Sequence, residues 1–284
     1  MAFFNRKSLA GLAALSLGSL ALLSTPAQAQ TTFDVIGPHE YELPTDYEPF
    51  NAFVQYSYVQ DNDKARDGDG NKVDGSGTQQ IVGLTKYVRF WTPSFNRRIG
   101  LAYEVIVPEI GVRDSANRSF AGGLGDPITG FAIWYNPTQG STLGFQSFVQ
   151  IPVGSSEVSD QTWKNLSSIL WHMPFGSKLS WTGDAGVVYQ STHTTTGLQP
   201  GMAFHTNNRF GYRALQWLEP FVGVDYQSVK ANDGVPKAYT FDGGAGLMFH
   251  MFDNQSLTFR YSTSFEGENY SQNNSFNVKY AYVW

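Results

Sequence analysis

SFNVKYAYVW, residues 275–284, is the stretch that decides the fold. In a β-strand successive side chains point to opposite faces, so this stretch would have one apolar, aromatic face and one mixed face. Bacterial outer-membrane barrels end on such an aromatic strand, and we therefore interpret the alternation as the closing strand of a barrel and as the signal to the barrel-assembly machinery. The residues of that signal are Phe276, Val278, Tyr280, Tyr282 and Trp284.

The first thirty residues have the three parts of a secretory signal. Arg6 and Lys7 precede an apolar run at 9–23, and Ala27-Gln28-Ala29 follows with small residues at the cleavage positions. The apolar run is shorter than the roughly 20 residues of a spanning helix. We expect a signal peptide over residues 1–29, cleaved near Ala29, and export of the remaining chain.

The composition excludes several classes of protein. The chain has no cysteine, which excludes a disulfide scaffold. Its mean hydropathy is −0.28 and no helix-length apolar run follows the signal, which argues against helical insertion. The net charge is −5 without a basic cluster, so nucleic acid is not an expected partner. Aromatic residues make up 15% of the chain and glycines number 29, as expected of strands between lipid and a wet lumen.

Residues 30–49 contain Pro38, Pro44 and Pro49 together with the acidic residues Glu40, Glu42, Asp46 and Glu48. Prolines disfavour regular structure, and the acidic side chains favour contact with water. We expect an extended, solvated periplasmic arm over residues 30–49, too short to plug a pore.

From Phe50 onward, alternating strands recur with short turns and longer connections in turn. About twelve strands of roughly ten residues suit a bilayer crossing, and their even number suits a bacterial barrel. The predicted fold is all-β, a transmembrane up-and-down antiparallel β-barrel over residues 50–284. Short turns face the periplasm in such barrels, which places both termini there and the polar loop at 61–77 outside. The predicted strands are 50–60, 78–91, 99–107, 124–135, 142–152, 164–174, 179–190, 202–212, 217–230, 239–252, 257–265 and 274–284.

Alternation also assigns the faces of the strands. A charge is expensive in lipid, so the polar face of each strand is expected to point into the lumen. The assignment stays open in two strands, because Lys86 and Arg89 fall on opposite faces and Leu170 and Trp171 are adjacent. The expected pore-lining charges are Glu104, Asp126, Asp184, Arg209, Asp225, Asp242, Arg260 and Lys279.

The stretch GGLGDPITGFAIWYNP at 122–137, followed by VQIPVGS at 149–155, resembles the meta-pathway of phenol degradation family of outer-membrane transporters. The resemblance implies a barrel channel associated with catabolism of aromatic or other hydrophobic compounds. Where that family often has Asn or Asp and a tyrosine after Pro-x-Gly, this chain has Ser155, Ser156 and Glu157, so loop-borne specificity can differ. The residues alone leave two roles for Asp126: a structural bond to a luminal arginine, or a part in permeation.

Enzymatic and metal-binding alternatives have weaker patterns. Ser191 and His193 are close in sequence, but their order differs from the His-x-Ser arrangement of barrel lipid hydrolases. The loop around Asp67 and Asp69 begins like a calcium loop, yet Lys72 occupies the position of the required glycine. We expect no enzyme activity, catalytic residue, metal or cofactor.

The sequence thus predicts a passive channel for small hydrophobic or aromatic molecules in the Gram-negative outer membrane. Gly, Ser, Thr and Gln would line its lumen, and a ladder of charges would constrict it. The expected partners are outer-membrane lipids, lipopolysaccharide, the assembly machinery and small hydrophobic solutes. Two alternatives remain: a structural or adhesive barrel whose lumen is closed, and a lipid-modifying enzyme.

Overall fold

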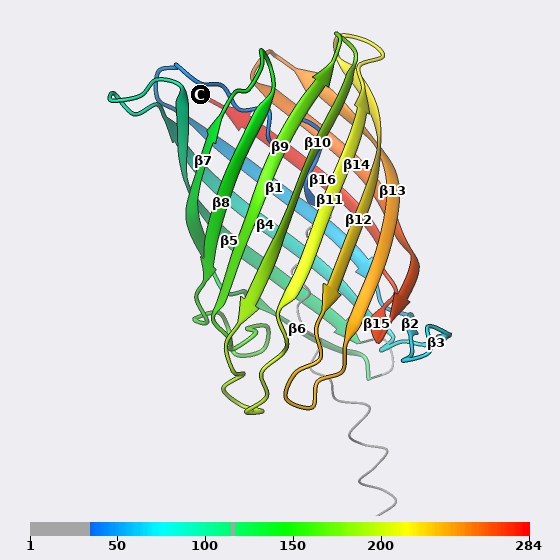
Figure 1. Cartoon of the computed structure of the whole chain (residues 1–284). Helices are drawn as coiled ribbons and strands as arrows, with labels where there is room; N and C mark the ends of the chain where they lie inside the picture. The colour runs from blue at the N-terminus through cyan, green and yellow to red at the C-terminus, as the bar shows by residue number, and fades with distance from the viewer. Residues whose placement is uncertain (1–34, 115–116) are drawn as a thin grey trace, which may run out of the picture. The chain divides into compact units, whose positions relative to one another are not determined.

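In the computed structural model, residues 35–114 and 117–284 are described, and within them twelve antiparallel strands close a barrel (Figure 1). The predicted signal peptide, and residues 30–34 of the predicted arm, lie outside the described residues. No helix in the described part of the chain has the length and apolarity to cross a membrane. The barrel strands are β1 (Phe50–Asp61), β4 (Thr78–Trp91), β5 (Ile99–Asp114), β7 (Ile128–Tyr135), β8 (Thr142–Gln150), β9 (Lys164–Phe175), β10 (Leu179–Gln190), β11 (Ala203–Tyr212), β12 (Leu218–Val229), β13 (Ala238–Met251), β14 (Gln255–Glu268) and β16 (Asn274–Val283).

Strand β16 closes the barrel, as its aromatic alternation predicts. Tyr280 is opposite Leu257 of β14 on one side and Gln55 of β1 on the other. Full pairing on both edges leaves the closing strand without an open edge, which is the condition for a strand to cross lipid. The predicted barrel and its strand number are confirmed.

One predicted strand begins later than expected, at Ile128 instead of Leu124. Pro127 has no backbone N–H for the ladder, and the carboxylate of Asp126 accepts hydrogen bonds from a loop. The residues before this break form β6 (Ser119–Leu124), which pairs with the far part of β5. The loop at 61–77 also contains structure, because β2 (Lys64–Arg66) pairs with β3 (Lys72–Asp74) and β15 (Tyr270–Ser271).

The two ends of the barrel differ in the length of their connections. The turns between β7 and β8, β9 and β10, β11 and β12, and β13 and β14 are short and lie with the carboxy-terminus at one end (Figure 1). We call this the short-turn end and the opposite one the long-loop end. The small sheet of β2, β3 and β15 lies at the long-loop end.

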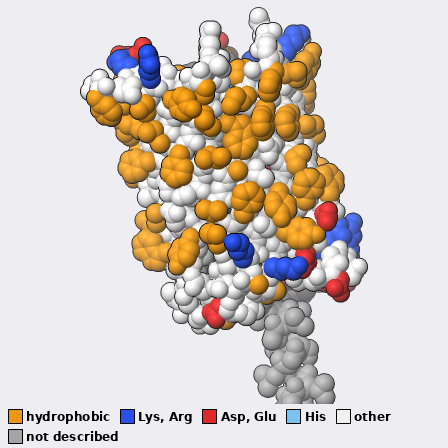
Figure 2. Space-filling model, in the orientation of Figure 1, with side chains coloured by type: hydrophobic (Ala, Val, Ile, Leu, Met, Phe, Trp, Pro, Cys, Tyr) orange, Lys and Arg blue, Asp and Glu red, His pale blue; other side chains and the backbone are white. Residues whose placement is uncertain are grey.

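On the face of the barrel shown in Figure 2, the outer wall is largely apolar and charged side chains gather toward its two ends. The two open strand assignments are settled: Lys86 forms an ion pair with buried Glu104, whereas Arg89 is exposed near the end of β4. Leu170 is buried, and Trp171 packs edge-on against Trp181 on the outer face. The rule that polar side chains point inward has an exception on the outer face, where the hydroxyl of Thr85 contacts Gln55 and Glu109, each at 2.7 Å.

Candidate functional site

The described part of the predicted arm lies inside the barrel, against inward-facing side chains. The indole N–H of Trp134 donates to the carbonyl of Pro44 at 2.8 Å, and Nε of Arg209 donates to the carbonyl of Ile36 at 2.8 Å. We call residues 36–47 the luminal segment. The prediction of a solvated arm is wrong for the inward-facing part of this segment, because the carbonyls of Ile36 and Pro44 and the carboxylate of Glu40 find partners on the barrel wall instead of in water. That the arm is too short to plug a pore stays a prediction.

Glu40 is the most strongly held residue of the luminal segment. Its carboxylate forms an ion pair with Lys279, lies 3.6 Å from Nζ of Lys86, and accepts a hydrogen bond from the hydroxyl of Tyr56 at 2.5 Å. Burial opposes the charged form, but Lys279 and Lys86 outweigh it and lower the pKa of Glu40 to about 2. Lys86 also pairs with Glu104 at 2.8 Å. Two of the predicted pore charges, Glu104 and Lys279, therefore belong to one network around Glu40.

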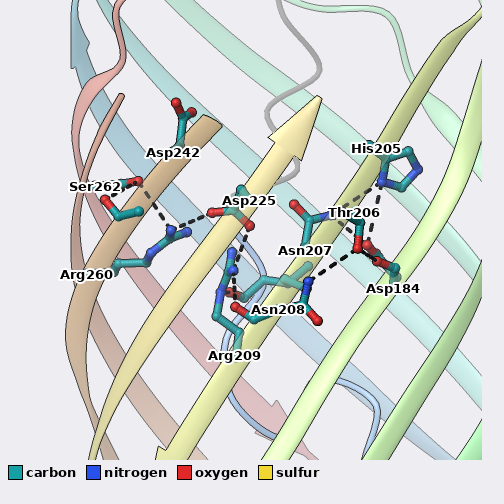
Figure 3. Close-up of polar contacts among 12 residues, drawn as sticks. Asp184, His205, Thr206, Asn207, Asn208, Arg209, Asp225, Asp242, Arg260 and Ser262 are labelled. Carbon is teal, nitrogen blue, oxygen red and sulfur yellow. Dashed lines mark hydrogen bonds and ion pairs between the residues drawn. The ribbon is translucent and has the colours of Figure 1, made fainter. Parts of the chain in front are cut away.

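Asp184 joins the luminal segment to β10 and β11. Its carboxylate accepts hydrogen bonds from the hydroxyl of Tyr41 at 2.7 Å and the amide of Asn207 at 2.6 Å. His205 lies 3.6 Å from the same carboxylate (Figure 3). Burial, together with the negative charge of Asp184, raises the pKa of Tyr41 well above its ordinary value. Tyr41 therefore stays neutral and acts as a hydrogen-bond donor.

A second network joins β11, β12 and β14 through Asp225. One carboxylate oxygen is 2.7 Å from Nη1 of Arg209, and the other is 2.5 Å from Nη2 of Arg260 (Figure 3). Arg260 also donates to the hydroxyl of Ser262 at 3.2 Å. Such charge-assisted pairs are stronger than neutral hydrogen bonds, so this network ties β11 to its neighbour β12 and, across β13, to β14.

Asp126 has a different partner from the arginine that the sequence suggested. One carboxylate oxygen accepts from the backbone N–H of Gly154 at 2.9 Å and from Ser159, and the other accepts from the N–H of Asp160 at 2.9 Å. Gln150 completes the set at 3.4 Å. Asp126 therefore organises the loop that follows β8.

All eight predicted pore-lining residues are buried, with 7% exposure or less. They form separate groups instead of one continuous ladder, and a role in permeation stays a prediction. Asp242 accepts hydrogen bonds from the hydroxyl of Thr240 at 2.7 Å and from the amide of Asn273 at 3.2 Å. Sequence reasoning missed the segment residues Glu40 and Tyr41, whose inward contacts no alternation pattern could indicate.

The interior also contains two apolar clusters, which the prediction of a Gly, Ser, Thr and Gln lining did not include. At the short-turn end, Leu43 and Tyr47 of the luminal segment pack on an inward-facing cluster that includes Phe90 and Trp134. We call the second one the mouth cluster. It lies toward the long-loop end and consists of Phe148, Leu166, Val188 and Ala203, with Ile128 and Val229 packed against it.

His39 carries the remaining polar contacts of the luminal segment. Its Nε2 is 2.8 Å from both carboxylate oxygens of Glu219, and its Nδ1 is 2.6 Å from Glu42. Burial alone would lower the pKa of His39, but the hydrogen bonds to these two carboxylates outweigh it and raise the pKa to about 9. His250 and Arg213 also contact Glu219, at 3.1 Å and 2.9 Å.

Known proteins share this architecture. A family model described as MetA-pathway of phenol degradation matches residues 62–280. The crystal structure of an outer membrane channel from Pseudomonas putida F1 is similar with a TM-score of 0.75 at 14% identity, covering 88% of this chain and 100% of that chain. The monoaromatic hydrocarbon channel CymD is similar with a TM-score of 0.51 at 12% identity, covering 88% and 93%. No curated protein matches. At these identities the structural likeness shows the fold, that of an outer-membrane barrel.

Proposed function

Because the chain belongs to the MetA-pathway of phenol degradation family, we propose that it is a passive outer-membrane channel for the uptake of small hydrophobic or aromatic compounds. The observation that carries the proposal is the mouth cluster. Inward-facing apolar side chains on four adjacent strands, β8 to β11, offer a nonpolar solute a favourable contact beside the polar groups of the bore. The name of the similar channel CymD points to the same class of solute.

The proposed path runs from the long-loop end to the short-turn end. A solute would first meet the mouth cluster and then the buried charges around Asp184 and Asp225. The luminal segment occupies part of the interior beyond them, so passage requires the segment to shift. Because hydrogen bonds and ion pairs hold it, and no covalent link does, such a shift is reversible.

The proposal includes the predicted signal peptide, the predicted assembly signal, the orientation of the barrel and its lipid partners. Removal of residues 1–29 would deliver the chain to the periplasm, where the assembly machinery would recognise the aromatic strand ending at Trp284. Both termini would then lie on the periplasmic side, with lipid around the apolar wall and lipopolysaccharide near the long loops.

A barrel with a closed lumen is the second candidate function, and the luminal segment favours it. A segment fixed by Glu40 and Tyr41 could close the bore permanently and leave a structural or adhesive barrel. A lipid-modifying enzyme has less support. The hydroxyl of Ser191 accepts from the N–H of Trp163 and so joins its loop to the connection before β9. Nδ1 of His193 accepts from the N–H of Thr195 within its own loop, so both side chains have structural partners.

The mouth cluster can be tested with polar substitutions of equal or smaller size. Val188→Thr combined with Leu166→Thr should lower the rate of toluene uptake into lipopolysaccharide-containing vesicles and leave arabinose entry unchanged. Val187→Thr is the matched control, since Val187 lies on the outer face. Unchanged toluene uptake by the double variant, with normal barrel folding, would remove the mouth cluster from the path.

A further inference from the structure

Three of the five histidines of the chain gather at the short-turn end. The ring of His39 lies 5.1 Å from that of His172 and 5.7 Å from that of His250, measured between centroids. They come from three separate elements: the luminal segment, β9 and β13. The proposed transport path does not use this gathering.

A buried carboxylate lies within reach of two of these rings. Nε2 of His39 is 2.8 Å from Glu219, and Nε2 of His250 is 3.1 Å from the same carboxylate. One ligand atom from each of the three residues lies within 4.8 Å of the other two. The side chain of Glu219 is 1% exposed, so water does not compete for its oxygens.

We propose that His39, Glu219 and His250 bind one divalent transition-metal ion of the class that prefers imidazole and carboxylate ligands, with Zn²⁺ as the probe. Two histidines and one glutamate are an established donor set for this ion, with a further position open to water. The three donors would move closer together, since zinc–ligand bonds are about 2.0–2.2 Å long. Binding would displace the proton of His39 and take the place of its hydrogen bond to Glu219.

A second set shares His39 but is the weaker site. It consists of His39, Glu42 and His172. The side chain of Glu42 is 52% exposed, so its carboxylate is hydrated and poorly fixed. Nδ1 of His172 is already held by the hydroxyl of Thr182 at 2.7 Å. Because the carboxylate of Glu219 is buried and that of Glu42 is exposed, the set of His39, Glu219 and His250 is the better metal site.

The consequence of this site is a link between the luminal segment and the barrel wall. His39 is the only ligand from the segment, while Glu219 and His250 belong to β12 and β13. A bound ion would hold residues around 39 against the wall more firmly than the hydrogen bonds do. This inference depends on the fold and not on the transported solute.

The experiment measures Zn²⁺ binding to the tag-free full chain in detergent, by competition with a chromophoric chelator and by metal content after dialysis. Wild type should bind one ion per chain. His39→Gln and His250→Gln should each weaken binding at least about ten-fold, because loss of a ligand exceeds the usual effect of an outer-shell change. The matched controls His193→Gln and His172→Gln should bind as wild type. Heat-modifiable migration on gels checks that each variant is folded.

Amide exchange of residues 36–42 gives a second readout. Zn²⁺ should slow exchange there in wild type and not in folded His250→Gln. The proposal is overturned if wild type does not bind Zn²⁺ stoichiometrically. It is also overturned if His172→Gln loses Zn²⁺ binding while His250→Gln keeps it, or if all histidine variants lose Zn²⁺ affinity equally. A failure of transport in vesicles would leave each of these outcomes unchanged.

Discussion

Asp225 is the residue on which the polar interior depends most, because two buried guanidinium groups share its carboxylate. Arg209 is fully buried, and Arg260 is 3% exposed. A buried ion pair loses its hydration on folding, so its net contribution to stability is small. Removal of one partner is strongly destabilising, because it leaves the other charge buried without compensation. The strand alternation predicted that all three side chains face inward, but their mutual distances depend on register, which sequence does not specify.

Asp225→Asn should lower the free energy of unfolding by about 3 kcal/mol, since both arginines lose their shared negative partner. The measurement is urea-induced unfolding in lipid vesicles, followed by tryptophan fluorescence. Asp69→Asn, in the exposed loop, is the control and should stay within about 0.5 kcal/mol of wild type. Equal stability of the two variants would contradict the assigned role of Asp225.

Asp126→Asn tests the other kind of buried carboxylate, one that binds backbone N–H groups. The amide would keep one acceptor and turn an N–H₂ group toward donors, so the loop after β8 should loosen. Amide exchange at Gly154 and Asp160 should become faster. The control is Glu157→Gln, which changes an exposed side chain of the same loop and should leave amide exchange as in wild type. Unchanged exchange in Asp126→Asn would show that the loop keeps its structure without the carboxylate of Asp126.

Among the elements, the luminal segment departs most from the sequence-based expectation. Prolines and acidic residues are typical of solvated chain, and no pattern within residues 36–47 reveals that Glu40 meets Lys279 from the far end of the sequence. The available signal was Lys279, which the alternation placed in the lumen and which pairs with Glu40. The strands could be predicted, because period-2 alternation is a local property of the sequence. The late start of β7 could not be predicted in this way, because it depends on the hydrogen-bond partners of Asp126.

A reversible crosslink can test whether the segment must move. Backbone N of Leu43 is 3.1 Å from the hydroxyl of Thr142, and the chain has no natural cysteine. Leu43→Cys with Thr142→Cys should lower toluene uptake when oxidised and recover it on reduction. The single variant Leu43→Cys should not respond to oxidant. Equal uptake in both redox states, with the crosslink verified, would show that solutes pass a stationary segment.

For the whole molecule, the barrel followed from alternation, loop length and the aromatic end, and the closing pairs of β16 with β1 and β14 confirmed it. The content of the lumen did not follow, because it is determined by contacts between residues far apart in sequence. The same limit applies to the mouth cluster. Leu166 and Val188 are unremarkable apolar residues in their strands, and only the neighbouring strands bring them together.

The central claim is that this barrel admits small hydrophobic compounds. The most direct measurement is the initial rate of radiolabelled toluene uptake into vesicles with a lipopolysaccharide outer leaflet, with and without the protein. Arabinose serves as the small polar solute for comparison. We predict a several-fold higher rate for toluene and little change for arabinose. Rates equal to those of protein-free vesicles for both solutes would contradict the channel and support the closed barrel.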